Sequence, residues 1–336
     1  MSAVRRGRGH EKRAQHGAVL VLVLWILTLL TFLLGAFSSE IRVENRIVGD
    51  MVERIRLRAG ATAVLNYLAL VGTSSPEGLA SLEGWPLSLP LSNATVAYRF
   101  VPEEAYVSLN AASPEMLGAL IGNYPDGVDD VDALVNALVD WRDGDDIVTE
   151  NGAENAEYAS AGLAYGPRNA PLLGVDELGL VLGFDQALVD WLRPYVSVAS
   201  MSAGIDARFA DPELVMMLDT EGRFSEQDLQ AMQEDQAVAD AMALESTFFA
   251  AARSGAYRVT VQGSGGMGLK RRQAIEVTVA FDAFGAMIAP APAGMEAMAG
   301  AMQGMAAGMG AMAAGSAPSP YRIIHWNEFP PLDVDG

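Results

Sequence analysis

The sequence predicts an α+β protein in which a long N-terminal helix packs on a small antiparallel sheet, with an all-helical domain inserted into the body. Three patterns predict this class. An uncharged segment at residues 18–37 continues into an amphipathic stretch at 38–71. Alternating apolar and polar residues, which are typical of strands, occur on both sides of residues 110–252. Residues 110–252 themselves carry repeated signals for helix starts.

The segment 18–37, AVLVLVLWILTLLTFLLGAF, contains twenty residues and no charge. As a helix it would span about 30 Å, the thickness of the hydrocarbon core of a bilayer. Residues 1–17 before it contain five basic residues and a single acid. This charge bias places the N-terminus in the cytoplasm and the body across the membrane. We therefore expect a single-pass transmembrane anchor.

Residues 38–71 continue the helix with an amphipathic pattern and without a proline. Apolar residues recur at intervals of three and four, and basic and acidic residues fill the other side. The apolar set is Ile41, Ile47, Val48, Met51, Val52, Ile55, Ala59, Ala63, Val64, Tyr67, Leu68 and Val71. One continuous helix of about 80 Å is therefore expected over residues 18–71.

A short basic leader, residues 1–17, ends in glycine, and a small residue then opens the apolar helix. This junction resembles type IV pilins and pseudopilins, in which a prepilin peptidase cuts after the glycine. The resemblance implies cleavage between Gly17 and Ala18. Most members carry glutamate at the fifth mature position, where this chain has Leu22; minor pseudopilins of the K type also lack that glutamate. The alternative is a signal anchor that is never cut.

Residues 72–109 are predicted to form a loop and the first strands of the body. Residues 72–94 are rich in serine, proline and glycine, which is typical of a connecting loop. Residues 95–110, TVAYRFVPEEAYVSLN, alternate in polarity. A turn at Pro102-Glu103-Glu104 would separate two strands.

Residues 110–252 are predicted to form the inserted helical domain, with two lobes as a possible arrangement. Helix starts are indicated by capping residues, some followed by proline. They are Ser113 with Pro114, Asp129 or Asp130, Asp211 with Pro212, and Ser225 with Asp228. Further helices are expected over 175–182 and 185–193.

The segment 109–115, LNAASPE, resembles the opening of helix-hairpin-helix (SAM-like) modules, many of which bind DNA. Charge argues against that function. Residues 110–200 contain three arginines and no lysine, and the chain beyond residue 17 has 17 basic and 41 acidic residues, a formal charge of −24. Such a body repels phosphate backbones, so we expect no nucleic-acid partner.

Four ordered blocks follow the first strands. They are LNAASPEML at 109–117, LVDWRDGDD at 138–146, GAE at 152–154 with Tyr158, and PRNAPL at 167–172 with DEL at 176–178. Together they resemble the K-type minor pseudopilins of type II secretion systems, the general secretion pathway protein K family. In that family the blocks mark a helical domain inserted into a pseudopilin fold.

Seven acidic residues lie within the eighteen positions 140–157. Hard cations such as Ca²⁺ prefer several carboxylate and carbonyl oxygens from a flexible loop. K-type pseudopilins bind calcium, so the resemblance implies calcium here, with Asp143, Asp145, Asp146 and Glu154 as candidate ligands. The spacing is not that of the twelve-residue calcium loop. The alternative is a solvated acidic loop in which Asp140 pairs with Arg142.

No constellation for catalysis emerges. The chain has no cysteine, and of its three histidines only His325 lies outside the leader. Two carboxylates can cleave a glycosidic bond, but nothing else in the sequence predicts a sugar cleft. We therefore expect no enzymatic activity.

Residues 253–336 are predicted to form the C-terminal strands. Residues 257–262 and 272–279 alternate around a glycine-rich turn and predict a hairpin, and 321–326 predict a returning strand. Between them, residues 285–320 are almost only alanine, glycine, methionine and proline. This insert is interpreted as flexible low-complexity sequence, as a helix that orders on a partner, or as a thioether copper site.

The sequence as a whole predicts a minor pseudopilin of a type II secretion system. The resemblance implies processing by prepilin peptidase and assembly with I- and J-type minor pseudopilins and the major pseudopilin. The resulting tip complex starts the pseudopilus and supports export across the outer membrane; exported substrates are candidate further partners. The anchor would lie in the inner membrane and the body in the periplasm. The alternative is an unprocessed, single-pass, membrane-anchored periplasmic cation-binding or adaptor protein.

Overall fold

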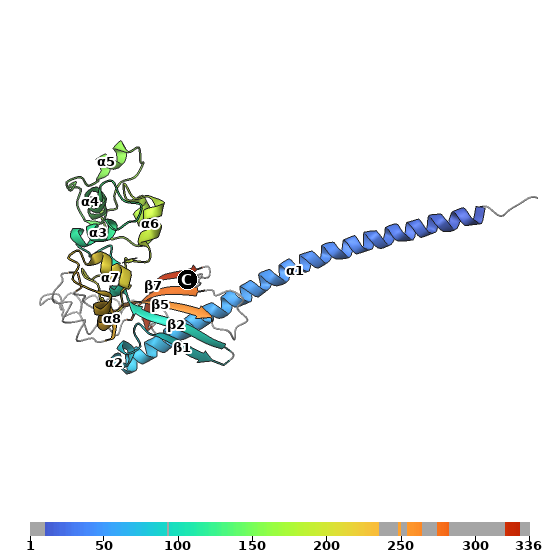
Figure 1. Ribbon diagram of the computed structural model, residues 1–336, viewed down its shortest axis with the longest axis horizontal. Coiled ribbons are helices and arrows are strands. Elements are labelled where there is room, and N and C mark those ends of the chain that lie inside the picture. The colour runs from blue at the N-terminus through green and yellow to red at the C-terminus, as the bar shows by residue number, and fades with distance from the viewer. Residues whose placement is uncertain are drawn as a thin grey trace, which may run out of the picture. The chain divides into compact units, whose positions relative to one another are not determined.

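The structure is a computed structural model that describes residues 11–92, 94–234, 248–249, 254–263, 274–281 and 320–329. The chain divides into two compact units, Met1–Arg56 and Leu57–Gly336. The predicted α+β class is confirmed, because helices accompany an antiparallel sheet (Figure 1). The predicted insert at 285–320 lies outside the described residues, apart from Pro320.

The first unit contains most of helix α1, Glu11–Ser74. The side chains at 19–33, within the predicted anchor, are exposed. The hydroxyl groups of Thr28 and Thr31 donate to the carbonyl oxygens of Leu24 and Leu27, at 2.8 and 2.6 Å. A search of the described residues finds no helix with the length and hydropathy needed to cross a membrane. The transmembrane segment 18–37 stays a prediction.

The second unit is built on a five-stranded sheet with the order β1-β2-β5-β6-β7, and all neighbouring strands are antiparallel. The strands are β1 Pro86–Leu91, β2 Ala94–Pro102, β5 Ala256–Gly263, β6 Ala274–Phe281 and β7 Tyr321–Phe329. The predicted hairpin and returning strand are therefore confirmed. The alternation of polarity that predicted them reflects one face packed on the core.

The prediction of a loop over 72–94 is wrong. The structure forms a short helix α2, Pro76–Ala80, and the edge strand β1 there. β1 contains Pro86 and Pro90, and proline is usually a sign against a strand. Proline has no backbone N–H to donate to a neighbouring strand. An edge strand tolerates it because one side of the strand has no neighbour, so no hydrogen bond is lost on that side.

Within the second unit, the end of α1 packs on one face of the sheet. Leu57, Ala61, Val64, Leu65 and Leu68 are at most 1% exposed. They share a core with residues of β2, β5 and β6, namely Val96, Phe100, Tyr257, Val259, Val261, Ile275 and Val277. The predicted apolar face is only partly correct, because Ile55 and Tyr67 are exposed.

The described residues from Val107 to Phe249 form a part of this unit that we call the helical lobe. It has a hydrophobic core of its own. Its helices are α3 Pro114–Ile121, α4 Val131–Arg142, α5 Asn155–Ser160, α6 Gln186–Leu192, α7 Pro212–Leu218 and α8 Glu226–Glu234. The predicted starts are confirmed by hydrogen bonds from Met116 N to Ser113 Oγ and from Ala133 N to Asp130 Oδ1. Residues Val175–Leu180 form a 3-10 helix, η2, which corrects the α-helix expected at 175–182.

The second strand predicted within 95–109 is the two-residue β3, Val107–Ser108. It pairs in parallel with β4, Val196–Ser197, and not with β2. Between β2 and β3 lies a single 3-10 turn, η1 Glu103–Ala105. The chain therefore leaves the sheet through η1 and enters the helical lobe directly.

Candidate functional site

The acidic loop, residues 143–154, connects α4 to α5 and is folded back on the last turn of α4. Asp140 in that turn is completely buried. Its carboxylate accepts hydrogen bonds from the backbone N–H groups of Thr149, at 3.2 Å, and Ala153, at 2.8 Å. A Cβ atom at Gly152 would lie 2.1 Å from Asp140 Oδ2, so only glycine fits there. Asp140 therefore acts as the anchor of the loop.

Two of the predicted ligands hold buried oxygens without a donor. Glu154 is 5% exposed, and its side chain faces the backbone N–H of Glu157 in a capping box at the start of α5. In the described part of the chain, neither of its carboxylate oxygens makes a hydrogen bond of normal geometry, and Asp143 Oδ1 makes none either. Burial, followed by repulsion from Asp140 and Asp143, raises the pKa of Glu154. Burial also raises the pKa of Asp143, although a hydrogen bond from the backbone of Asp145 acts in the opposite direction; repulsion from the Asp145 and Asp140 carboxylates adds to the rise. Such groups favour either a proton or a cation.

The other two predicted ligands lie at the surface of the same loop. Asp145 Oδ1 accepts a hydrogen bond from Ile147 N at 2.9 Å. Asn169 Nδ2 donates to Asp146 Oδ1 at 2.9 Å and to the Asp145 carbonyl oxygen at 2.7 Å. Among the described residues, no three His, Asp or Glu side chains are already arranged as a metal-binding group. The identity of the ligands stays a prediction.

The pair between Asp140 and Arg142, which belongs to the alternative of a solvated acidic loop, does not form. Arg142 instead donates to the carbonyl oxygens of Leu109 and Ala112, at 2.6 and 2.7 Å. Burial lowers the pKa of Arg142. The arginine of the second sequence block therefore holds the first block against the end of α4.

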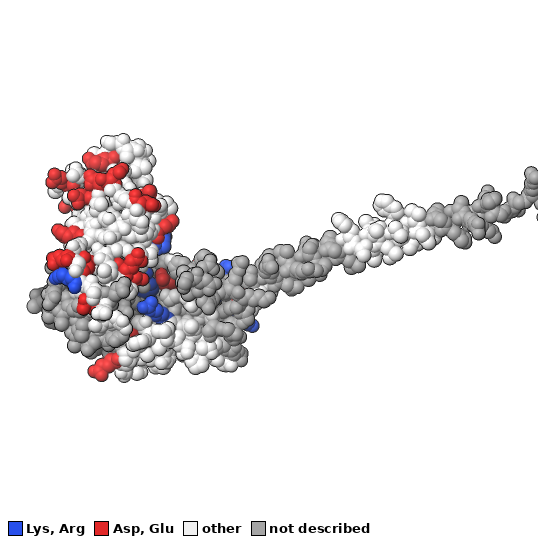
Figure 2. Space-filling view, in the orientation of Figure 1, with Lys and Arg blue, Asp and Glu red and all other residues white. Residues whose placement is uncertain are grey.

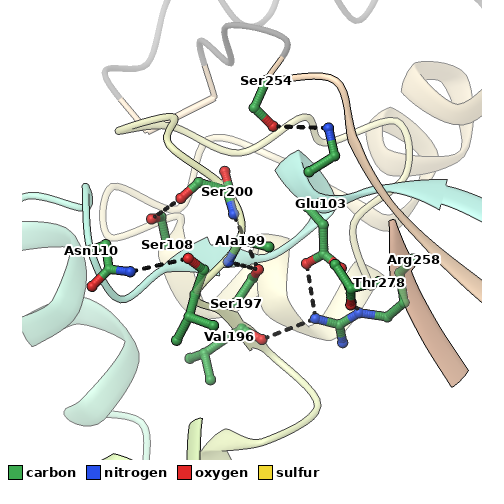
Figure 3. Close-up of polar contacts among 12 residues, drawn as sticks. Glu103, Ser108, Asn110, Val196, Ser197, Ala199, Ser200, Ser254, Arg258 and Thr278 are labelled. Atoms are coloured by element: carbon green, nitrogen blue, oxygen red, sulfur yellow. Dashed lines mark hydrogen bonds and ion pairs between the residues drawn. The ribbon is translucent and has the colours of Figure 1, made fainter. Parts of the chain in front are cut away.

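Asn110 connects the first sequence block to the fourth. Its Nδ2 donates to the carbonyl oxygens of Leu172 and Val198, both at 3.0 Å, and its Oδ1 accepts from Leu172 N at 2.8 Å. Figure 3 shows Asn110 beside Ser108 and the Ser197–Ser200 turn. The blocks, which are separated in sequence, thus meet around the start of the helical lobe.

A buried ion pair joins the helical lobe to the sheet, and the sequence patterns did not predict it (Figure 3). Glu103 of η1 is 0% exposed and Arg258 of β5 is 13% exposed, with 3.0 Å between Oε2 and Nη2. Thr278 of β6 donates to Glu103 Oε1 at 3.0 Å, and Arg258 donates to the carbonyl oxygen of Val196 in β4 at 3.3 Å. The guanidinium also lies 3.6 Å from the centre of the Tyr106 ring.

Electrostatics at this junction favour the charged state of the arginine. Burial is the largest single influence and would lower the pKa of Arg258, but attraction to Glu103, Tyr106 and Glu276 together outweighs it, so the pKa is raised. Burial raises the pKa of Glu276, which also faces this arginine. The next residue along η1 adds a further contact, because Glu104 accepts a hydrogen bond from Ser254 N. This polar cluster is structural, since it connects lobe and sheet and leaves no charge of the pair unpartnered.

Acidic side chains gather over the helical lobe (Figure 2). Ion pairs within the helical lobe include Arg168 with Glu177 at 2.9 Å and Arg193 with Asp176 at 2.6 Å. Among the described residues 110–234, acidic side chains outnumber basic ones, which disfavours contact with phosphate groups.

A helix that packs on an antiparallel sheet, with a helical lobe inserted after β2, defines an α+β class of protein. Residues 94–201 match the family model described as type II secretion system (T2SS), protein K. The resemblance predicted from the four blocks is confirmed: the chain is similar to type II secretion system protein K.

Three curated relatives carry that name. The protein of Pectobacterium carotovorum subsp. carotovorum is 23% identical over 212 residues, which cover 56% of this chain and 64% of the relative. The protein of Aeromonas hydrophila is 25% identical over 210 residues, covering 55% and 63%. The protein of Klebsiella pneumoniae is 36% identical over 86 residues, covering 25% and 26%. The chain therefore spans less than two thirds of each of these relatives.

A solved structure, the GspK-GspI-GspJ complex from the enterotoxigenic Escherichia coli type 2 secretion system, contains a similar chain. The TM-score is 0.46 at 14% sequence identity, and the alignment covers 82% of this chain and 99% of that chain.

Proposed function

We propose that this chain is a minor pseudopilin of the K type, a structural subunit of the pseudopilus tip in a type II secretion system. The observation that carries the proposal is the match of residues 94–201 to protein K of that system. The contacts of Asn110 and Arg142 support it, because the residues of the shared blocks hold the helical lobe together. The role is non-catalytic.

The proposal includes a single-pass anchor at 18–37 in the inner membrane, with the N-terminus in the cytoplasm and the body in the periplasm. The hydroxyl groups of Thr28 and Thr31 bond within the helix, as a lipid environment requires. Prepilin peptidase cleaves between Gly17 and Ala18. Leu22 at the fifth mature position suits a subunit with no neighbour stacked above it, because a carboxylate at that depth needs a partner.

The mature chain joins I- and J-type minor pseudopilins and the major pseudopilin. The bulk of the helical lobe supports a position at the tip, because a lobe of this size obstructs stacking inside a filament. Exported substrates are further partners in this proposal, since a tip subunit meets them first.

N-terminal sequencing of the membrane-extracted protein tests the maturation step. Protein from cells with prepilin peptidase is expected to begin at Ala18, and Gly17→Glu protein to keep its leader. In a strain without the chromosomal copy, the wild type should restore export and the uncut variant should not. Full export by the uncut variant, or an intact leader on the wild type, favours the unprocessed adaptor.

We further propose that the acidic loop binds calcium through Asp143 and Glu154, with Asp145 and Asp146 as additional ligands. The buried, unpartnered oxygens of Asp143 and Glu154 fit this role, and so does the all-oxygen donor set. Bound calcium would offset the mutual repulsion that raises the pKa of both groups.

Thermal melting with and without calcium tests this site. Calcium at about 100 times its Kd stabilises a protein by about 2.7 kcal/mol, and we expect a rise of that order for the wild type. The variants Asp143→Asn and Glu154→Gln should lose most of it, whereas Asp132→Asn, at an exposed position of α4, should keep it. An equal calcium response in all four proteins contradicts the site.

The stabilisation by calcium should also depend on pH. The folded protein holds protons on Asp143 and Glu154 more tightly than the unfolded chain does, because both pKa values are raised above 3.8 and 4.5. Without calcium, these groups make the protein less stable as the pH rises through the raised values. The stabilisation by calcium should therefore grow with pH over that range and then level off.

A further inference from the structure

We infer that a groove beside the first strands of the sheet docks an extended, acid-bearing segment of a neighbouring subunit of the pseudopilus tip; this inference rests on the proposed function. The groove has a volume of about 740 Å³. Its walls include Trp85, Arg99, Tyr106, Pro194, Phe209 and Pro212. Aromatic rings and prolines that line an open surface pocket are typical of surfaces that bind extended peptides.

Trp85 is presented to solvent, and hydrogen bonds hold the two residues that precede it. Its side chain is 64% exposed, whereas that of Trp141 in the lobe core is 3% exposed. Gly84 N donates to the Phe100 carbonyl oxygen at 2.8 Å, and the Glu83 carboxylate accepts from the Tyr257 hydroxyl at 3.2 Å. A rigid backbone under an exposed indole lowers the entropic cost of binding a partner.

Gly84 is required for this presentation. Its φ angle is +80°, in the region that favours glycine, and a Cβ atom would lie 3.0 Å from the Phe209 ring. The turn therefore lies directly against Phe209, on one wall of the groove.

Arg99 supplies the charge for recognition. It is exposed, and its Nε donates to the Gly84 carbonyl oxygen at 3.1 Å. Within the described ranges, no ion pair involves Arg99, while Arg208 in the same groove is held by Asp206 at 2.6 Å. An open guanidinium beside an indole selects a segment that carries a carboxylate next to an apolar side chain. Tryptophan and arginine are also the residues most enriched among interface hot spots.

The position of the groove favours a neighbouring subunit as its occupant. The turn with Trp85 follows the end of α1 and the short α2. A subunit whose own helix lies along α1 meets this turn. A second copy of this chain is a poor occupant, because copies with a formal charge of −20 repel one another.

The test is a titration of the purified full chain, in detergent, with the purified I- and J-type subunits of the same secretion system. Trp85→Ala and Arg99→Glu should each raise the Kd by about tenfold or more, and Trp85→Phe and Arg99→Lys by less. Both side chains are exposed, so the melting temperature of each variant should stay close to that of the wild type.

Two controls change similar groups elsewhere. Leu173→Ala removes an apolar side chain that is 70% exposed, and Arg322→Glu reverses an exposed charge on β7. Both should bind as the wild type does. If Trp85→Ala and Arg99→Glu bind with wild-type affinity, the groove is not the docking site, and the proposed function is unaffected. The same conclusion follows if Arg322→Glu loses as much affinity as they do. If the wild type binds neither subunit, the proposed partners fail and the inference with them.

Discussion

Glu103 and Arg258 are 155 positions apart, and each is charged in a place where water is almost excluded. Burying two charges costs free energy because both lose their water. Attraction between the charges and their hydrogen bonds offset that cost. Here the hydrogen bonds reach three elements, because Thr278 lies in β6, Val196 in β4 and Glu103 in η1. The pair therefore fixes how the lobe meets the sheet within the second unit.

Removal of one partner should destabilise the protein strongly. Arg258→Met leaves Glu103 buried without its cation, and we expect a loss of about 3–5 kcal/mol in the free energy of unfolding. Urea denaturation of the wild type and the variant measures it. The double variant Arg258→Met, Glu103→Gln should lose less than Arg258→Met alone. A double variant that is as unstable as the sum of the single variants would contradict direct coupling.

Sequence patterns identify few of these contacts. Asp143 and Glu154 stand out because many acids lie close together in the chain, and the structure places both in one loop. The Glu103–Arg258 pair joins positions far apart in sequence, and no periodicity signals it. Trp85 and Arg99 meet because β1 and β2 form a hairpin, and that hairpin was hidden by the prolines of β1.

At the scale of elements, the strongest predictions come from local chemistry. Proline after a capping residue marks the starts of α3 and α7, and alternation marks β2, β5, β6 and β7. The errors have tertiary causes. The edge position of β1 permits two prolines. At η2, where the pattern predicts a longer helix, the chain forms a 3-10 helix that places Leu178 in the core of the helical lobe.

The start of α4 gives a test at this scale, because the sequence left Asp129 and Asp130 as alternatives. The structure assigns the cap to Asp130, whose Oδ1 accepts from Ala133 N at 2.9 Å. Asp130→Ala should lower the free energy of unfolding by about 1 kcal/mol, and Asp130→Ser should restore most of it. Asp129→Ala is the matched control. A larger loss in the control than in Asp130→Ala would move the cap to Asp129.

At the scale of the molecule, α1 has two different tasks. Up to Arg56 it belongs to the first unit, and from Leu57 it is part of the core of the second. Gly60 shows how closely this part of the helix approaches the sheet, since a Cβ there would lie 2.9 Å from a methyl group of Val96. The end of α1 is thus a structural part of the body, independent of the role of the start of the helix.

A pair of truncations separates these tasks. A chain that begins at residue 50 keeps Leu57, Leu65 and Leu68, which are at most 1% exposed, and we expect it to fold. A chain that begins at residue 72 loses all three. Each buried leucine contributes about 2–5 kcal/mol, and a whole domain has only about 5–15 kcal/mol of stability, so the shorter chain should not fold. Circular dichroism and a cooperative melting transition distinguish the two. A cooperative transition in the shorter chain would mean that the sheet and the helical lobe are stable without the helix, and that α1 serves only as an attachment.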